Sequence, residues 1–111
     1  MTEVITDKKE IDKIIADKIK GKEIIFTQYY RIGIAQKGIS HEKVIQIFPQ
    51  FEKVIAIEKD ILKHGNMGYE LFYELSSNTS FSIATIPNDK NILIIHTVEY
   101  KRDLSHRFKQ K

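Results

Sequence analysis

Aromatic and basic side chains that suit contact with RNA are the residues of this sequence that point to one kind of chemistry. Aromatic rings can stack on unpaired bases, and guanidinium groups can hold phosphates. A histidine or lysine can transfer the proton when a 2′-hydroxyl attacks the neighbouring phosphate, and such cleavage requires no metal ion. Packing at the edge of the core explains Tyr30 and Tyr73 better than RNA contact does. The full set comprises Tyr29, Tyr30, Tyr69, Tyr73, Tyr100, Arg31, His96, Arg102, His106 and Arg107.

Carboxylates on the predicted strands could supply a general base. Glu70 and Glu74 alternate with apolar residues, which places both on one face of their strand. Either could accept a proton only if that face forms a cleft rather than open water. Cross-strand charge pairs with lysines explain the whole group adequately. The group comprises Glu58, Asp60, Glu70, Glu74 and Glu99.

The sequence offers little for metal or cofactor chemistry. It contains no cysteine, so a thiolate zinc site and a cysteine nucleophile are excluded. The four histidines have no spacing that places two on one helical or strand face, although folding could bring His64 and His96 together with Glu58 or Asp60. There is no glycine-rich loop of the kind that binds phosphates. We therefore expect neither a metal nor a cofactor.

Charge is distributed unevenly along the 111 residues. The net charge is +3, but the last eleven residues carry five basic side chains against Asp103, which leaves residues 1–100 at −1. A basic tail can attract phosphates or an acidic partner, or can simply increase solubility. Met1 leads into charged residues rather than an apolar run, and no segment is long enough to span a bilayer. We expect a cytoplasmic protein without membrane contact.

Helical signals occupy the first half of the chain. Asp7 can cap a helix in which isoleucines recur at helical spacing until Gly21. Thr27 can cap a second helix that Gly38 ends, and Ser40 can cap a third, short helix that ends before Pro49. The sequence therefore predicts two or three helices before residue 50.

Strand signals begin at about Lys53, where β-branched and aromatic residues alternate or run in short blocks. The connections are too short for parallel crossovers, so neighbouring strands should be antiparallel. We predict an α+β fold in which the N-terminal helices pack on a four-stranded antiparallel β-meander. Residues 1–104 would form one domain, and 105–111 a basic C-terminal tail. The predicted strands are 53–63, 69–75, 80–86 and 92–100.

The segment from Ile25 to Arg31, followed by Lys37-Gly38-Ile39-Ser40, resembles uncharacterised RelE-like families. In those families a strand ends in a polar residue, a helix carries an arginine, and a Gly-Ile-Ser step opens the next helix. They usually have histidine where Tyr29 or Tyr30 stands here. Helices before an antiparallel sheet and a basic or aromatic C-terminus make the whole chain look like a small toxin-type domain of this class.

The resemblance implies a ribonuclease that cuts messenger RNA, often on the ribosome, and that an antitoxin holds inactive. By position, Tyr100 and Arg102 match the aromatic and basic residues that orient RNA and stabilise charge on the phosphate. His96 would act as an acid or base. We therefore predict a metal-independent endoribonuclease toxin. Its catalytic residues would be His96, Tyr100 and Arg102, with RNA bound by Tyr29, Arg31, Lys101, His106 and Arg107.

Two alternatives use the same features differently. A non-catalytic inhibitor or adaptor would present a sheet edge or the basic tail to a partner. A nucleic-acid-binding domain would hold its ligand through the tail without cleaving it, and its affinity would fall steeply with salt. The sequence does not indicate an oligomeric state.

Overall fold

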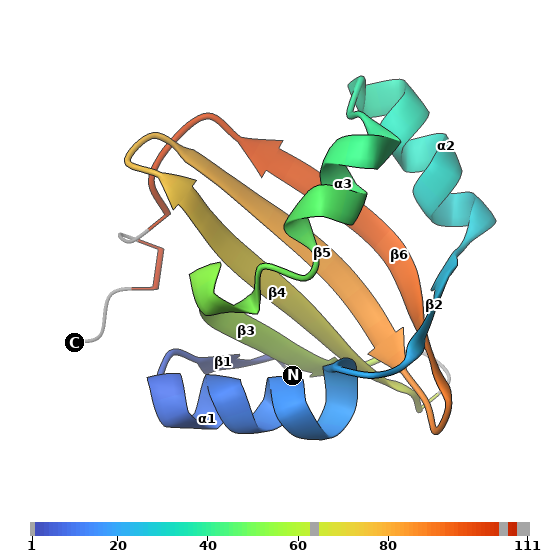
Figure 1. Ribbon diagram of the computed structural model, residues 1–111, viewed down its shortest axis with the longest axis vertical. Coiled ribbons are helices and arrows are strands. Elements are labelled where there is room, and N and C mark those ends of the chain that lie inside the picture. Colours follow the sequence, from blue (N-terminus) through green and yellow to red (C-terminus); the bar gives the residue numbers. More distant parts are fainter. Residues whose placement is uncertain (1, 63–64, 105–106, 109–111) are drawn as a thin grey trace.

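A six-stranded sheet forms the centre of the protein, and helices cover one of its faces (Figure 1). The computed structural model describes residues 2–62, 65–104 and 107–108. The strands are β1 (Thr2–Ile5), β2 (Glu23–Phe26), β3 (Val54–Ile61), β4 (Met67–Ser76), β5 (Thr79–Pro87) and β6 (Asn91–Tyr100). The α-helices are α1 (Lys8–Ile14), which continues as a π-helical turn η1 (Ile15–Ile19), α2 (Gln28–Lys37) and α3 (His41–Ile47). A short 3₁₀ turn, η2 (Phe51–Lys53), precedes β3.

Each α-helix begins at the capping residue that the sequence indicates. The side chains of Asp7, Thr27 and Ser40 accept hydrogen bonds from the backbone amide three residues later, at 3.1, 3.1 and 3.3 Å. These bonds satisfy amides that have no partner within the first helical turn. Gly38 ends α2 in the left-handed conformation, with φ of 70°. The helix boundaries therefore follow from local sequence chemistry.

The predicted architecture of helices on a four-stranded antiparallel meander is wrong. The strand order is β1-β3-β4-β5-β6-β2, and the sheet is mixed because β2 runs parallel to β6. The four predicted strands correspond to β3–β6, but β1 precedes all the helices and β2 lies between α1 and α2, so the helices do not form one N-terminal group. Both additional strands have four residues and pair with strands distant in sequence, so neither alternation nor a local turn signals them.

The main core lies between the sheet and the helices and contains the two tyrosines for which packing was the better explanation. Tyr30 and Tyr73 are both fully buried. The Tyr73 hydroxyl donates to the Phe48 carbonyl at 2.7 Å, and burial raises the pKa of Tyr73. The Tyr30 hydroxyl lies 2.9 Å from His41 Nδ1. Burial raises the pKa of Tyr30 despite the opposing effect of the Arg31 charge. Neither ring is available to stack on a base.

The opposite face of the sheet, which we call the open face, is partly covered by the chain end. Leu104 and Phe108 are buried there in a small cluster with Ala56 and Phe72. The Phe72 and Phe108 rings meet edge to face, with centroids 4.7 Å apart. Of the predicted tail, Arg107 and Phe108 are described, and Phe108 belongs to the folded structure.

None of the helices in the described part of the chain combines the length and the apolar character needed to cross a lipid bilayer.

Candidate active site

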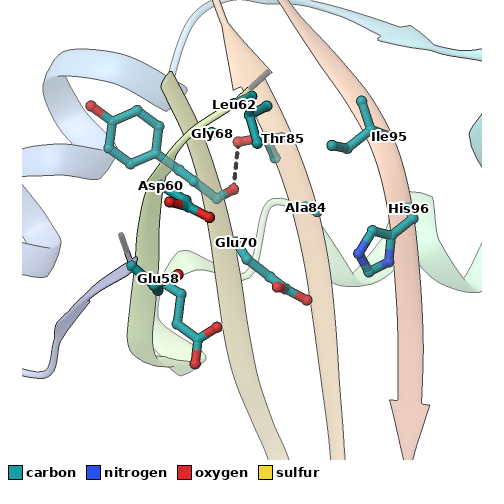
Figure 2. Close-up of a pocket in the computed structure, with 11 residues that line it drawn as sticks. Glu58, Asp60, Leu62, Gly68, Glu70, Ala84, Thr85, Ile95 and His96 are labelled. Atoms are coloured by element: carbon teal, nitrogen blue, oxygen red, sulfur yellow. Dashed lines mark hydrogen bonds between the residues drawn. The ribbon is translucent and has the colours of Figure 1, made fainter. Parts of the chain in front are cut away.

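One transverse row of side chains on the open face brings a carboxylate and a histidine together. Glu58 on β3 pairs in register with Glu70 on β4, Glu70 with Ala84 on β5, and Ala84 with His96 on β6. Residues opposite one another in neighbouring strands share a face. Glu70 and His96 therefore flank a methyl group, with their Cα atoms about 10 Å apart across two strand spacings. Figure 2 shows the carboxylate and the imidazole directed toward each other across β5.

A β-bulge places His96 on this face. Ala84 pairs with His96 and Thr85 pairs with Ile94, so Ile95 is an extra residue in β6. Ile92 and Ile94 are buried on the helix-covered face. Simple alternation would put His96 on that face as well, but the extra residue reverses the alternation. Bulges commonly redirect side chains beside active sites.

The row lines a cavity of about 250 Å³ on the open face (Figure 2). Its ionisable lining residues are Glu58, Asp60, Tyr69, Glu70 and His96. The cleft that a general-base role for Glu70 requires is therefore present, whereas Glu74 on the same strand is exposed to solvent. A carboxylate and an imidazole on opposite sides of a cavity can act as a base and an acid toward one bound group.

Arg107, near the chain end, does not line this cavity but contacts Glu58, one of its lining residues. Its Nη2 donates to Glu58 Oε2 at 3.1 Å, and its guanidinium carbon lies 4.9 Å from the centre of the Phe72 ring. Burial alone would lower the pKa of Arg107, but Glu58 and Tyr100 outweigh it and raise the pKa. Arg107 therefore partly offsets the negative charge around the cavity.

A second hollow, of about 270 Å³, lies between α2 and the part of β6 that extends beyond β2. His96 lines this hollow as well as the first cavity, so the two hollows meet at this residue. Lys37 Nζ donates to the Thr97 carbonyl at 2.9 Å and covers the strand edge there. The other lining residues are Tyr29, Ile32, Gly33 and Gln36.

The predicted catalytic residues fall into two places. His96 lies beside Glu70, whereas Tyr100 lies four residues further along β6, about 13 Å away at strand spacing. The Arg102 guanidinium stacks on Tyr100 at 5.7 Å. The Ser80 hydroxyl donates to the Arg102 carbonyl at 3.0 Å and fixes the backbone at this point.

The predicted RNA-binding residues are also dispersed. Tyr29 is 71% exposed beside the second hollow. Arg31 lies over the Phe26 ring, with its guanidinium carbon 6.0 Å from the centroid. Lys101 Nζ lies 3.7 Å from Glu99 Oε2, away from both cavities. His106 is outside the described residues. Among the residues that are described, no group of three or more His, Asp or Glu side chains could hold a metal ion.

The site predicted from the sequence does not include Glu70, Gln36 or Lys37. The alternation of polar and apolar residues around Glu70 indicates on which face of the strand Glu70 lies, but it does not show that this face contains a cavity. Gly33 inside α2 was a signal for the second hollow, because glycine in a helix interior is unfavourable unless space or contact requires it.

An apolar hollow of about 410 Å³ lies on the helix-covered side, between η1, β2 and α3. Ile24 and Ile45 in its lining are 40% and 47% exposed. Among the residues that the structure describes, Lys20 and Lys22 are its charged lining residues and no carboxylate lines it. It is separate from the residues around His96.

No protein-family model, curated protein sequence or solved structure matches this chain. The case for a function therefore depends on the geometry of the site.

Proposed function

We propose that the protein is a cytoplasmic, metal-independent endoribonuclease of the RelE-like kind, with Glu70 and His96 as its acid-base pair. The observation that carries the proposal is their position on opposite sides of one open-face cavity, with the small Ala84 between them. The resemblance in residues 25–40 and the aromatic and basic residues near the end of β6 support the same substrate class.

In the proposed reaction, the Glu70 carboxylate removes the proton from a ribose 2′-hydroxyl, and the oxygen attacks the adjacent phosphorus. Protonated His96 donates its proton to the departing 5′-oxygen. The P–O5′ bond breaks as the new P–O2′ bond forms. The products are a 2′,3′-cyclic phosphate and a free 5′-hydroxyl, and the carboxylic acid and the imidazole then return to their starting states by exchanging protons with water.

Charge on the phosphate requires nearby cations during this reaction. Arg107 is a cation bound to Glu58, which lines the cavity. Tyr100 and Arg102 form a stacked pair further along β6, where they suit a role in orienting the RNA strand rather than contact with the reacting atoms. In this proposal Tyr100 and Arg102, which the sequence predicted to be catalytic, act at the periphery of the site.

The test is cleavage of labelled single-stranded RNA, and separately of messenger RNA on translating ribosomes, with a chelator present. Glu70→Gln and His96→Ala should each lower the cleavage rate by about 10²- to 10⁴-fold. Glu74→Gln is the matched control, because Glu74 lies on the same strand but is exposed, and it should cleave normally. The products should carry 2′,3′-cyclic phosphate ends. Undiminished cleavage by both site variants would contradict the assigned roles, and no cleavage in either assay would contradict the nuclease itself.

Protein binding is a second candidate function, and the apolar hollow favours it. Apolar lining flanked by Lys20 and Lys22 suits an acidic amphipathic helix from a partner such as an antitoxin-like protein. A synthetic helical peptide rich in leucine and glutamate should bind in a calorimetric titration. Ile45→Lys should abolish this binding, whereas Ile61→Lys, at an exposed residue of β3 outside the hollow, should leave it intact. Equal binding by both variants would exclude the hollow as the docking site.

A further inference from the structure

We infer that the hollow between α2 and β6 is a subsite for one nucleobase of the RNA, next to the phosphate between Glu70 and His96. This inference rests on the proposed function. Its starting point is His96, which lines both the acid-base cavity and the hollow. A nucleotide whose phosphate contacts His96 therefore has room for an adjoining base on the α2 side of that residue.

The α2 surface of the hollow has the composition that base binding requires. Tyr29, Gly33 and Lys37 follow one another at intervals of four residues, so they lie along one face of the helix. Tyr29 is 71% exposed, which leaves its ring free for stacking. The Gln36 amide can both donate and accept hydrogen bonds at a base edge.

Gly33 keeps the hollow open. A Cβ atom at this position would meet one neighbouring atom within contact range, Lys37 Nζ at 4.0 Å. Glycine is otherwise unfavourable in a helix interior, so the absence of a side chain here needs a reason. A larger residue at position 33 would occupy the hollow without straining the backbone.

Charge favours approach of the RNA from this side. In the described part of the chain, the lining of the hollow includes Lys37 and no carboxylate, whereas Glu58, Asp60 and Glu70 line the cavity beyond His96. The Lys37 ammonium uses one of its three donors on the Thr97 carbonyl and can direct another to a phosphate. The volume of about 270 Å³ suits one base rather than a stacked pair.

The experiment has two parts. Kinetics of RNA cleavage give KM and kcat, and NMR titration gives the affinity for each of the four nucleoside monophosphates. Tyr29→Ala should raise KM and weaken nucleotide binding by about 5- to 150-fold, the range found for loss of one base stack, with kcat nearly unchanged. Tyr29→Phe should recover most of the affinity that Tyr29→Ala loses, because stacking needs only the ring. Gly33→Leu should block the hollow and therefore also raise KM and weaken nucleotide binding. The matched control is Ala35→Leu, which adds a side chain of the same size to an α2 residue outside the lining of the hollow.

The outcomes separate this inference from the proposed function. Normal KM and nucleotide binding in both Tyr29→Ala and Gly33→Leu would overturn the subsite, even if RNA is cleaved. Equal losses in Gly33→Leu and Ala35→Leu would overturn it too, because the effect would then come from bulk on α2. If the wild type cleaves nothing but binds nucleotides in a Tyr29-dependent manner, the subsite stands and the nuclease fails. Absence of both activities would overturn both.

Discussion

Replacing Ser82 with alanine should stabilise the protein, whereas the same replacement at Ser80 should destabilise it. Both serines lie on the open face of β5, two residues apart, and both are fully buried. The Ser80 hydroxyl donates to the Arg102 carbonyl at 3.0 Å. Ser82 Oγ has no hydrogen-bond partner within the described parts of the chain. The pair therefore isolates the effect of one hydrogen bond in nearly identical surroundings.

The two magnitudes follow from the cost of burying hydroxyl groups. Burying a hydroxyl group without a hydrogen-bond partner costs about 1–3 kcal/mol of stability. Replacing the serine with alanine removes this cost, but it also removes the packing contacts of the oxygen atom, so the net gain is smaller. We expect Ser82→Ala to increase the free energy of unfolding by about 1 kcal/mol. A hydrogen bond contributes about 0.5–1.5 kcal/mol to stability, so Ser80→Ala should decrease the free energy of unfolding by a similar amount.

Urea denaturation monitored by circular dichroism measures both effects. The denaturation midpoints should move in opposite directions while the m-value stays constant. The corresponding shifts in Tm are about 4 °C upward and about 4 °C downward for a domain of this size. Equal losses of stability in the two variants would refute the reasoning, because they would show that Ser82 has a partner or that serine is required on this strand for another reason.

Three further changes test other parts of the structure. Phe108→Ala should lower the free energy of unfolding by about 3 kcal/mol, because the ring is buried against Phe72; an unchanged urea midpoint would show that the chain end is not packed. Tyr73→Phe should lower the free energy of unfolding by about 1–2 kcal/mol, because it removes the hydrogen bond to the Phe48 carbonyl. Thermal unfolding would measure this loss. The hydrogen bond from Lys43, assisted by charge, lowers the pKa of Glu99. The stability that this contributes, about 1 kcal/mol or less, is present above the ordinary Glu pKa of 4.5 and is lost as pH falls through the lowered value. The free energies of unfolding of the wild type and Glu99→Gln, measured by denaturation, should therefore converge as the pH is lowered. A difference that stays constant with pH would contradict this.

The sequence predicted the helices because their signals are local. Thr27, for example, caps α2 through an amide only three residues away, and Gly38 ends it one residue after its last turn. The four longer strands also carry their own alternating or apolar patterns. β1 and β2 carry too few residues for any period, and the partner of each lies more than 50 residues away, so only the folded chain identifies them.

The candidate site was less predictable because it depends on register rather than composition. His96 was recognised by its chemistry, but its position opposite Glu70 requires the bulge at Ile95 and a small residue, Ala84, in the strand between them. No spacing within one segment encodes that relation. Arg107 was predicted to contact RNA from a basic tail, and its contact with Glu58 depends on the chain end folding back over the sheet.

The parallel pairing of β2 with β6 also constrains the order of folding. Ile24 pairs with Ile92, so this contact joins residues 68 positions apart in the sequence and cannot form before Ile92 has been synthesised. Contacts of such long range form late and slow the folding of small domains. Because β2 leads directly into α2, the same late event brings Tyr29 beside His96. On the ribosome, the nascent chain would therefore lack the complete hollow, and any activity that depends on it, until β6 has left the exit tunnel.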